Sequence, residues 1–246
     1  MNYPPNTAFR GFGGPQGVIV IESILQQIAQ LLNKDSVDIR RLNAYRDGDE
    51  QANTTPFGQM IKDHMIVESI DQLVTTSDYH KRVAVIDSHN APSRLTVKGI
   101  AMSTIKFGIS FTSKFLNQGN ALVNVYTDGT GQGTPFFYFT TGAAIAEVTI
   151  DRFTGELTVD RVDLLMDVGK MINPGIDIGQ IIGGFVQGIG WCTNEELVYD
   201  STGKLLSTSP TTYKIPNVTD IPAVFNVATI DNPKHVINVS RLVRCS

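Results

Sequence analysis

Hydrophobic residues recur at helical spacing through the first third of the chain. Between residues 15 and 32 they return every three or four positions with glutamines between them, which predicts a long amphipathic helix whose apolar face is buried. A second helix is expected to begin at Asp35 or Ser36, either of which can cap it, and to run to about Tyr45. The same period returns in residues 57–90, which are expected to be mostly helical.

Extended chain replaces the helical period from Arg94 onward. Residues 94–129 carry apolar positions typical of strands, and residues 143–166 alternate apolar and polar positions around a Thr-Gly turn, which predicts a β-hairpin. A helix is expected over residues 174–190, and a last strand near residues 224–230. The sequence therefore predicts an α+β fold, with mixed helices and mostly antiparallel sheets.

Glycines are frequent in the helix expected over residues 174–190. Asn173 and Pro174 supply a cap and a first helical residue, but glycines follow at positions 179, 183, 184, 188 and 190. Each glycine costs a helix roughly 1 kcal/mol relative to alanine. Glycine is favoured where another group must come close to the backbone, so we expect such an approach along this helix.

Composition narrows the class of protein. The 246 residues are 41% hydrophobic, enough for one large domain or two small ones. The formal net charge is -4 and there is no stripe of basic residues, so no nucleic-acid partner is expected. No apolar run is long enough to span a membrane, and the N-terminus has no secretory signal pattern. Two cysteines cannot hold an iron–sulfur cluster, and a reducing location is expected, either the cytoplasm or a peroxisome.

Few isolated polar residues show a pattern that indicates chemistry. Four histidines lie far apart without metal-ligand spacing and are expected at the surface: His64, His80, His89 and His235. Asp167 and Asp177 are expected to cap helices or close turns. The adjacent Glu195 and Glu196 follow the glycine-rich helix and are interpreted as a solvated helix end rather than as a general acid and base.

The densest candidate site is the segment from Asn6 to Gly17, which reads Asn-Thr-Ala-Phe-Arg-Gly-Phe-Gly-Gly-Pro-Gln-Gly. Its glycines let a ligand approach the backbone, and the N-terminus of the following helix presents N–H groups that attract anions. Arg10 adds a fixed positive charge. This chemistry suits a phosphate or an oxyanionic cofactor, although a glycine-rich turn before a core helix gives the same pattern.

This segment resembles the signature of the xanthine dehydrogenase and aldehyde oxidase family of molybdenum hydroxylases. Further motifs agree with the family in the same order: residues 106–112, 115–119, 125–129, 166–169, 173–180, 185–190 and 212–216. The resemblance covers nearly the whole chain. It implies that residues 1–130 form a first part of a molybdopterin-binding region and residues 131–246 a second part.

The resemblance also implies roles for five residues. Arg10 matches an arginine whose backbone lies near the molybdenum and the substrate. Phe12 and Phe111 match two aromatic rings that contact the substrate, and Gln187 matches a glutamine that binds the pterin. Gln132 matches a second pterin-binding glutamine, with a plain polar turn as the alternative. The implied cofactor is molybdenum-molybdopterin.

Members of this family hydroxylate purines such as hypoxanthine and xanthine, and the electrons leave through 2Fe-2S clusters and FAD. Those groups must lie outside this chain, in other segments or subunits, and intact relatives are expected to be homodimers. Phe111 favours a flat purine substrate over an aldehyde, because the aldehyde oxidase relatives do not keep this ring.

Three departures from the family pattern reduce the expected activity. The family's upstream half has no counterpart, and a long segment after Thr130 is missing. The chain also ends before the glutamate that serves the family as general base, so no catalytic residue is retained. We therefore expect the chain alone to be inactive. The alternatives are a cofactor-free remnant that associates with a partner, and an aldehyde-oxidising relative.

Overall fold

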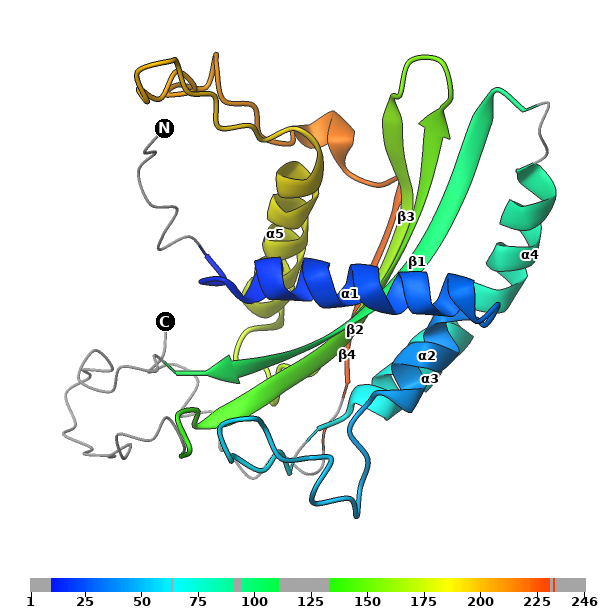
Figure 1. Ribbon diagram of the computed structural model, residues 1–246, viewed down its shortest axis with the longest axis vertical. Helices are drawn as coiled ribbons and strands as arrows, with labels where there is room; N and C mark the ends of the chain where they lie inside the picture. The colour runs from blue at the N-terminus through cyan, green and yellow to red at the C-terminus, as the bar shows by residue number, and fades with distance from the viewer. Residues whose placement is uncertain (1–9, 63, 91–93, 111–132, 231, 233–246) are drawn as a thin grey trace.

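The computed structural model describes residues 10–62, 64–90, 94–110, 133–230 and 232. A four-stranded sheet in the order β1-β2-β3-β4 forms its centre (Figure 1). The strands are β1 Thr96–Ile109, β2 Tyr138–Asp151, β3 Leu157–Met166 and β4 Val224–Thr229. β1–β2 and β2–β3 are antiparallel and β3–β4 is parallel, so the expected α+β fold with mostly antiparallel strands is confirmed. The expected extended chain beyond Ser110 lies outside the described residues.

The hairpin of β2 and β3 forms where the alternating pattern predicts it. Gly155 takes a φ of 73°, which a side chain would disfavour, and closes the turn through its N–H to the Asp151 carbonyl at 2.9 Å. The Asp151 carboxylate accepts hydrogen bonds from the Phe153 and Thr154 N–H groups, both at 2.8 Å. These bonds lower the pKa of Asp151.

Five α-helices flank the sheet among the described residues: α1 Gly14–Leu31, α2 Ser36–Leu42, α3 Ile66–Thr76, α4 Tyr79–His89 and α5 Pro174–Thr193. Asp35 caps α2, as expected, by accepting a hydrogen bond from the Val37 N–H at 2.9 Å. Residues 57–62, 64 and 65 are not helical, which corrects the sequence prediction. Gly58 has a φ of 85° there, and Thr54 pairs with Met60 in an isolated antiparallel bridge.

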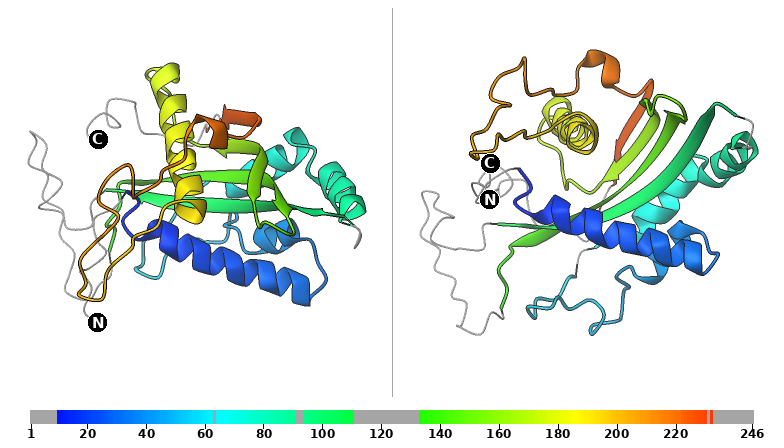
Figure 2. Two further views of the ribbon diagram at one scale, coloured as in Figure 1. Left: turned by 90° about the horizontal axis from the view of Figure 1, so that it is seen from above. Right: turned by 45° about the horizontal axis from the view of Figure 1, so that its top comes forward.

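The hydrophobic core joins the two parts of the chain that the sequence separates at residue 130. Residues of α2 and α3 supply Val37, Ile70 and Leu73, while β2 and β3 supply Ile145 and Leu165. α3 buries its residues at positions 66, 69, 70 and 73, which is the spacing of one helical face. Figure 2 shows α5 standing apart from α2, α3 and α4, with the sheet between them.

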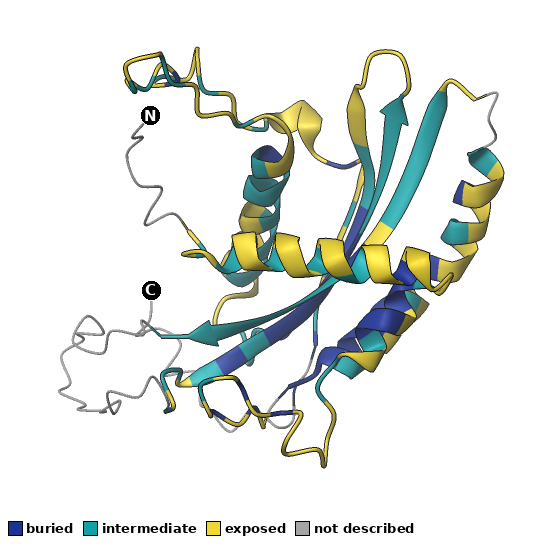
Figure 3. Cartoon of the chain, in the orientation of Figure 1, coloured by how far each residue is buried: buried dark blue, intermediate teal, exposed yellow. Residues whose placement is uncertain are grey.

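Helix α1 differs from the prediction that its apolar face is buried. Ala29 is its one buried residue, whereas Val20 is 60% exposed and Leu31 is 85% exposed. Most of α1 is drawn as exposed in Figure 3, in contrast to the buried α2 and α3. Amphipathic spacing indicates that a helix can bury a face, but the described residues cover little of this one. No helix in the described part of the chain is long and apolar enough to cross a membrane.

Candidate functional site

The turn before α1 has an unusual backbone. Gly11, Phe12 and Gly13 all have positive φ angles, of 92°, 46° and 88°. Glycine adopts such angles freely, whereas a phenylalanine does so only under local constraint. Phe12 is 64% exposed, so the turn carries a large aromatic ring at the surface. This placement is compatible with the ligand-contacting role that the resemblance implies for Phe12.

Helix α1 starts immediately after this turn and lies close to the sheet. A Cβ atom added to Gly14 would lie 2.7 Å from Phe107 Cε2, so Gly14 permits the close packing of the helix N-terminus on β1. The N-cap residue is Gly13, with no side-chain cap and no acidic residue in the first turn. The positive end of the α1 dipole therefore has no carboxylate of its own helix to neutralise it.

Arg10 connects this turn to α5. Its Nη1 donates to Gln187 Oε1 at 3.4 Å, and its Nη2 donates to Gln180 Oε1 at 3.2 Å. The structure therefore brings together Arg10 and Gln187, which the resemblance assigned to one cofactor site although 177 positions separate them. No carboxylate of the described residues lies within ion-pair distance of Arg10. Among the described residues, its charge is therefore held by neutral amides alone.

Helix α5 is fixed at its N-terminus by a reciprocal cap. Asn173 Oδ1 accepts from the Gly175 and Ile176 N–H groups, and Asp177 Oδ2 accepts from the Ile172 and Asn173 N–H groups. The expected capping role of Asp177 is confirmed. Asp167 likewise takes its expected turn role, because its Oδ1 accepts from the Gly169 N–H at 3.1 Å.

The α5 glycines divide into two groups. Cβ atoms added to Gly179, Gly183, Gly184 and Gly188 would meet nothing within 4 Å. The expectation of a close approach is therefore not met there by the described residues. It is met at Gly190, where a Cβ atom would collide with the Glu195 carboxylate and lie 2.5 Å from Pro216 Cδ. Gly183 and Gly184 stand between Gln180 and Gln187 in the helix, so the amides flank a stretch of bare backbone.

The C-terminal end of α5 is tied to the loop that follows it. The Tyr213 hydroxyl donates to Glu195 Oε2, and this hydrogen bond raises the pKa of Tyr213. Glu195 is half-buried and Glu196 is exposed. The interpretation of this pair as a solvated helix end is therefore correct only for Glu196, since Glu195 holds the loop against α5.

Two predicted site residues, Phe111 and Gln132, lie outside the described residues. His64 corrects the expectation of surface histidines, because it is 3% exposed. Its ring lies 5.7 Å from the Tyr45 ring, and Asn53 Nδ2 is 3.4 Å from its Nε2. Irregular chain around Asn53 buries it, which no periodic pattern indicates. Within the described part of the chain, no group of three or more His, Cys, Asp or Glu side chains could hold a metal ion.

Sequence reasoning missed Gln180. Its signal was present, because residues seven positions apart lie on the same face of an α-helix, and Gln180 precedes Gln187 by seven. A contact from Arg10 to one glutamine therefore places the other within reach of the same long side chain.

Family comparison agrees with this geometry. A model described as a molybdopterin cofactor-binding domain matches residues 129–222, and a second model with the same description matches residues 1–44. Together they cover more than half of the chain and contain both Arg10 and Gln187. The chain belongs to the molybdopterin cofactor-binding domain family.

Individual relatives agree with the family. The xanthine dehydrogenase of Dictyostelium discoideum is 31% identical over 357 residues, which include 96% of this chain and 26% of the relative. The chain thus spans about a quarter of the length of that relative. The matched region is longer than the 246 residues of this chain, in agreement with the expected internal deletion.

Solved structures share the fold at lower sequence identity. Quinoline 2-oxidoreductase from Pseudomonas putida 86 superposes with a TM-score of 0.77 at 18% identity, over 94% of this chain and 47% of that one. Aldehyde oxidoreductase from Desulfovibrio gigas gives a TM-score of 0.72 at 20% identity, over 92% of this chain and 36% of that one. The fold is therefore that of molybdenum hydroxylases of different substrate classes.

Proposed function

We propose that this chain is the part of a molybdenum hydroxylase that holds molybdenum-molybdopterin between the α1 turn and α5. The observation that carries the proposal is the hydrogen bond from Arg10 to Gln187, which joins the two segments that the two family models match. The rest of the enzyme, including 2Fe-2S and FAD groups, would come from other segments or subunits.

The residues of the site fit the chemistry of such a cofactor. Arg10 offers a guanidinium without a carboxylate partner among the described residues, which suits a phosphate or another oxyanion. The N-terminus of α1, which has no side-chain cap, adds N–H groups that also attract an anion. Gln187 offers an amide for the hydrogen-bonding edge of a pterin, and the bare backbone at Gly183 and Gly184 leaves room for a flat ring. When bound, the cofactor supplies the redox chemistry of hydroxylation.

For the whole enzyme we propose hydroxylation of purines, as in xanthine dehydrogenases. The support is the 31% identity to a xanthine dehydrogenase across nearly the whole chain. Phe12 would contribute a ring against the flat face of the substrate. An aldehyde substrate is the second candidate, and assays of a restored full-length enzyme with both substrate classes separate the two.

Binding of a pterin to the chain tests the proposal directly. The sole tryptophan, Trp191, follows Gln187 by one helical turn and provides an intrinsic fluorescent probe. Titration with a pterin that carries a phosphate monoester should quench it saturably. Gln187→Met keeps the length of the side chain and removes its amide, so the affinity should fall about five- to tenfold. The matched control is Gln27→Met on the exposed side of α1, which should bind like the wild type.

Two further measurements separate a cofactor-binding chain from a cofactor-free remnant. Purification from cells that make the cofactor should yield molybdenum near one atom per chain, whereas a remnant yields none. The isolated chain should form no urate from xanthine, because it spans about a quarter of the length of the xanthine dehydrogenase that it matches, and the redox groups of the proposed enzyme would lie in the rest. Turnover within tenfold of an intact xanthine dehydrogenase would contradict this expectation.

A further inference from the structure

The Arg10 side chain donates hydrogen bonds to two glutamines, which differ in whether they also contact the proposed ligand. The hydrogen bond to Gln180 is the shorter, at 3.2 Å, against 3.4 Å to Gln187. Under the proposed function Gln187 also serves the pterin, so its hold on Arg10 is shared with the ligand. Gln180 has no second hydrogen bond among the described residues, and its oxygen can remain on Arg10 when a ligand is present.

We propose that Gln180 is the positioning residue of this site, which holds the Arg10 guanidinium over α5. This inference rests on the proposed function for its consequence, because Arg10 is positioned toward an anionic ligand. Arg10 itself is exposed, and an arginine loses much rotamer freedom when it is held in one place. A neutral amide restrains the side chain before the ligand arrives and leaves its positive charge intact.

The neutral charge of Gln180 determines how its substitution should change the mobility of Arg10. Gln180→Glu keeps the size of the side chain and would bind Arg10 more tightly, as a carboxylate does. It would also neutralise the charge that attracts an anion. Gln180→Met would remove the shorter of the two hydrogen bonds that hold Arg10 and leave its charge unchanged. The two variants therefore have opposite effects on the mobility of Arg10, although both weaken the binding of an anion.

Chemical labelling of Arg10 tests whether Gln180 restrains its side chain, and it needs no ligand. A dicarbonyl reagent such as phenylglyoxal modifies free guanidinium groups, and mass spectrometry of the peptide that contains Arg10 reports its rate. The rate should rise about two- to tenfold in Gln180→Met. It should fall below the wild-type rate in Gln180→Glu and stay unchanged in Gln27→Met. Equal rates at Arg10 in the wild type and both Gln180 variants would overturn the inference.

Binding then tests the consequence for the ligand. With the phosphorylated pterin, Gln180→Met should lower the affinity about two- to tenfold, and Gln180→Glu should lower it further. The same pterin without its phosphate, and molybdate ion alone, distinguish a phosphate from a metal oxyanion as the group that Arg10 meets. In an Arg10→Met background the effect of Gln180→Met should vanish, because the glutamine acts through the arginine. An effect that persists there would make Gln180 a direct ligand contact and overturn the positioning role.

The two proposals fail in different ways. A wild-type chain that binds neither the pterins nor molybdate contradicts the proposed function. The labelling rates still show whether Gln180 restrains Arg10. A wild-type chain that binds the phosphorylated pterin, with unchanged affinity in Gln180→Met, supports the proposed function and overturns the positioning of Arg10 by Gln180. Unfolding by urea of each variant, with the same midpoint as the wild type, confirms that the changes do not arise from loss of structure.

Discussion

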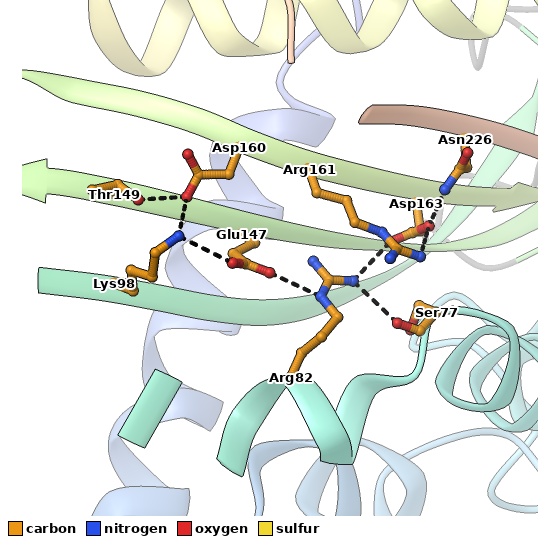
Figure 4. Close-up of polar contacts among 9 residues, drawn as sticks. All are labelled: Ser77, Arg82, Lys98, Glu147, Thr149, Asp160, Arg161, Asp163 and Asn226. Atoms are coloured by element: carbon orange, nitrogen blue, oxygen red, sulfur yellow. Dashed lines mark hydrogen bonds and ion pairs between the residues drawn. The ribbon is translucent and has the colours of Figure 1, made fainter. Parts of the chain in front are cut away.

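Two regions of the molecule differ in how they pair their charges and cover their apolar residues. Between α4 and the strands, three cations and three anions form one connected cluster (Figure 4): Arg82, Lys98, Arg161, Glu147, Asp160 and Asp163. Where the N-terminus of α1 meets α5, Arg10 donates to neutral amides and to no carboxylate of the described residues, and apolar residues of α1 are exposed. The first region pairs its charges within the chain, although Arg82 Nη2 is buried without a hydrogen-bond partner among the described residues. The second region presents groups that a ligand or a further protein segment could pair with.

Arg82 has the central place in the charged cluster. Its Nε donates to Glu147 Oε2 at 2.9 Å and its Nη1 to Asp163 Oδ2 at 2.8 Å. Arg161 holds the same Asp163 with two hydrogen bonds, at 2.8 and 2.9 Å, and Asn226 of β4 donates to it at 2.7 Å. The cluster therefore links α4, β2, β3 and β4, and substitutions in it should affect stability far more than substitutions of exposed residues around Arg10 and α1.

The largest expected effect is that of Arg82→Met. The variant removes the cation that Glu147 and Asp163 share, and removal of one partner from a buried ion pair typically costs about 3–5 kcal/mol. Because Lys98 still pairs with Glu147 and Arg161 with Asp163, we expect a loss at the lower end of that range. Urea unfolding followed by circular dichroism measures the loss. The control is Arg41→Met, whose ion pairs with Asp38 and Asp71 are exposed and should be worth less than about 1 kcal/mol. Similar losses in both variants would remove the distinction between the two regions.

The next largest effects are expected from alanine substitutions of α5 glycines, which should have opposite effects on stability at the two ends of the comparison, Gly190 and Gly183. Gly190→Ala would push its methyl group into Glu195 and Pro216, and overpacking of this kind typically costs about 1–3 kcal/mol. Gly183→Ala meets open space, so the better helix propensity of alanine should stabilise the chain by up to about 1 kcal/mol. Under the proposed function the same Gly183→Ala should weaken pterin binding. A variant that is more stable and binds as tightly as the wild type would place the ligand elsewhere.

A smaller effect should follow pH. Burial raises the pKa of Asp163, but the hydrogen bonds from Arg161 and Asn226 and the nearby positive charges outweigh burial and leave its pKa below the ordinary value. A depressed folded-state pKa adds stability above the unfolded-state value of about 4, and this stability is lost as the pH falls through the folded-state pKa. Asp163→Asn should therefore lose less stability than the wild type between pH 4 and lower pH values.

The smallest effect is expected on the exposed face of α1. Ile24 is 46% exposed, so Ile24→Gln should change the free energy of unfolding by less than about 0.5 kcal/mol. Ala29→Gln, at a residue 1% exposed on the same helix, should destabilise the chain by a clearly larger amount. Urea midpoints of the two variants make the comparison. A large loss in Ile24→Gln would show that this face is buried in solution against a partner or a second copy.

Local sequence patterns predicted secondary-structure elements but not the tertiary contacts that these elements make. The β2–β3 hairpin and the N-terminus of α5 were predictable because a Thr-Gly turn and an Asn-Pro cap act over a few residues. The joining of Arg10 and Gln187 followed only from the family resemblance. The charged cluster had no sequence signal, since Arg82 and Asp163 are 81 positions apart. Periodicity likewise identified the apolar face of α1 but not what covers it. Cytoplasmic or peroxisomal location stays a prediction.

The ends of β1 and β2 lie side by side. Ile109 is the partner of Tyr138, the Phe137 N–H donates to the Ile109 carbonyl at 3.2 Å, and the Ser110 hydroxyl donates to the Pro135 carbonyl at 2.6 Å. The chain therefore leaves the sheet and re-enters it at one point. In general, closing a loop of twice the length costs a chain only about 0.6 kcal/mol more. Evolution, or an engineer who inserts a reporter domain, can lengthen or shorten the protein at this junction while both strands keep their register.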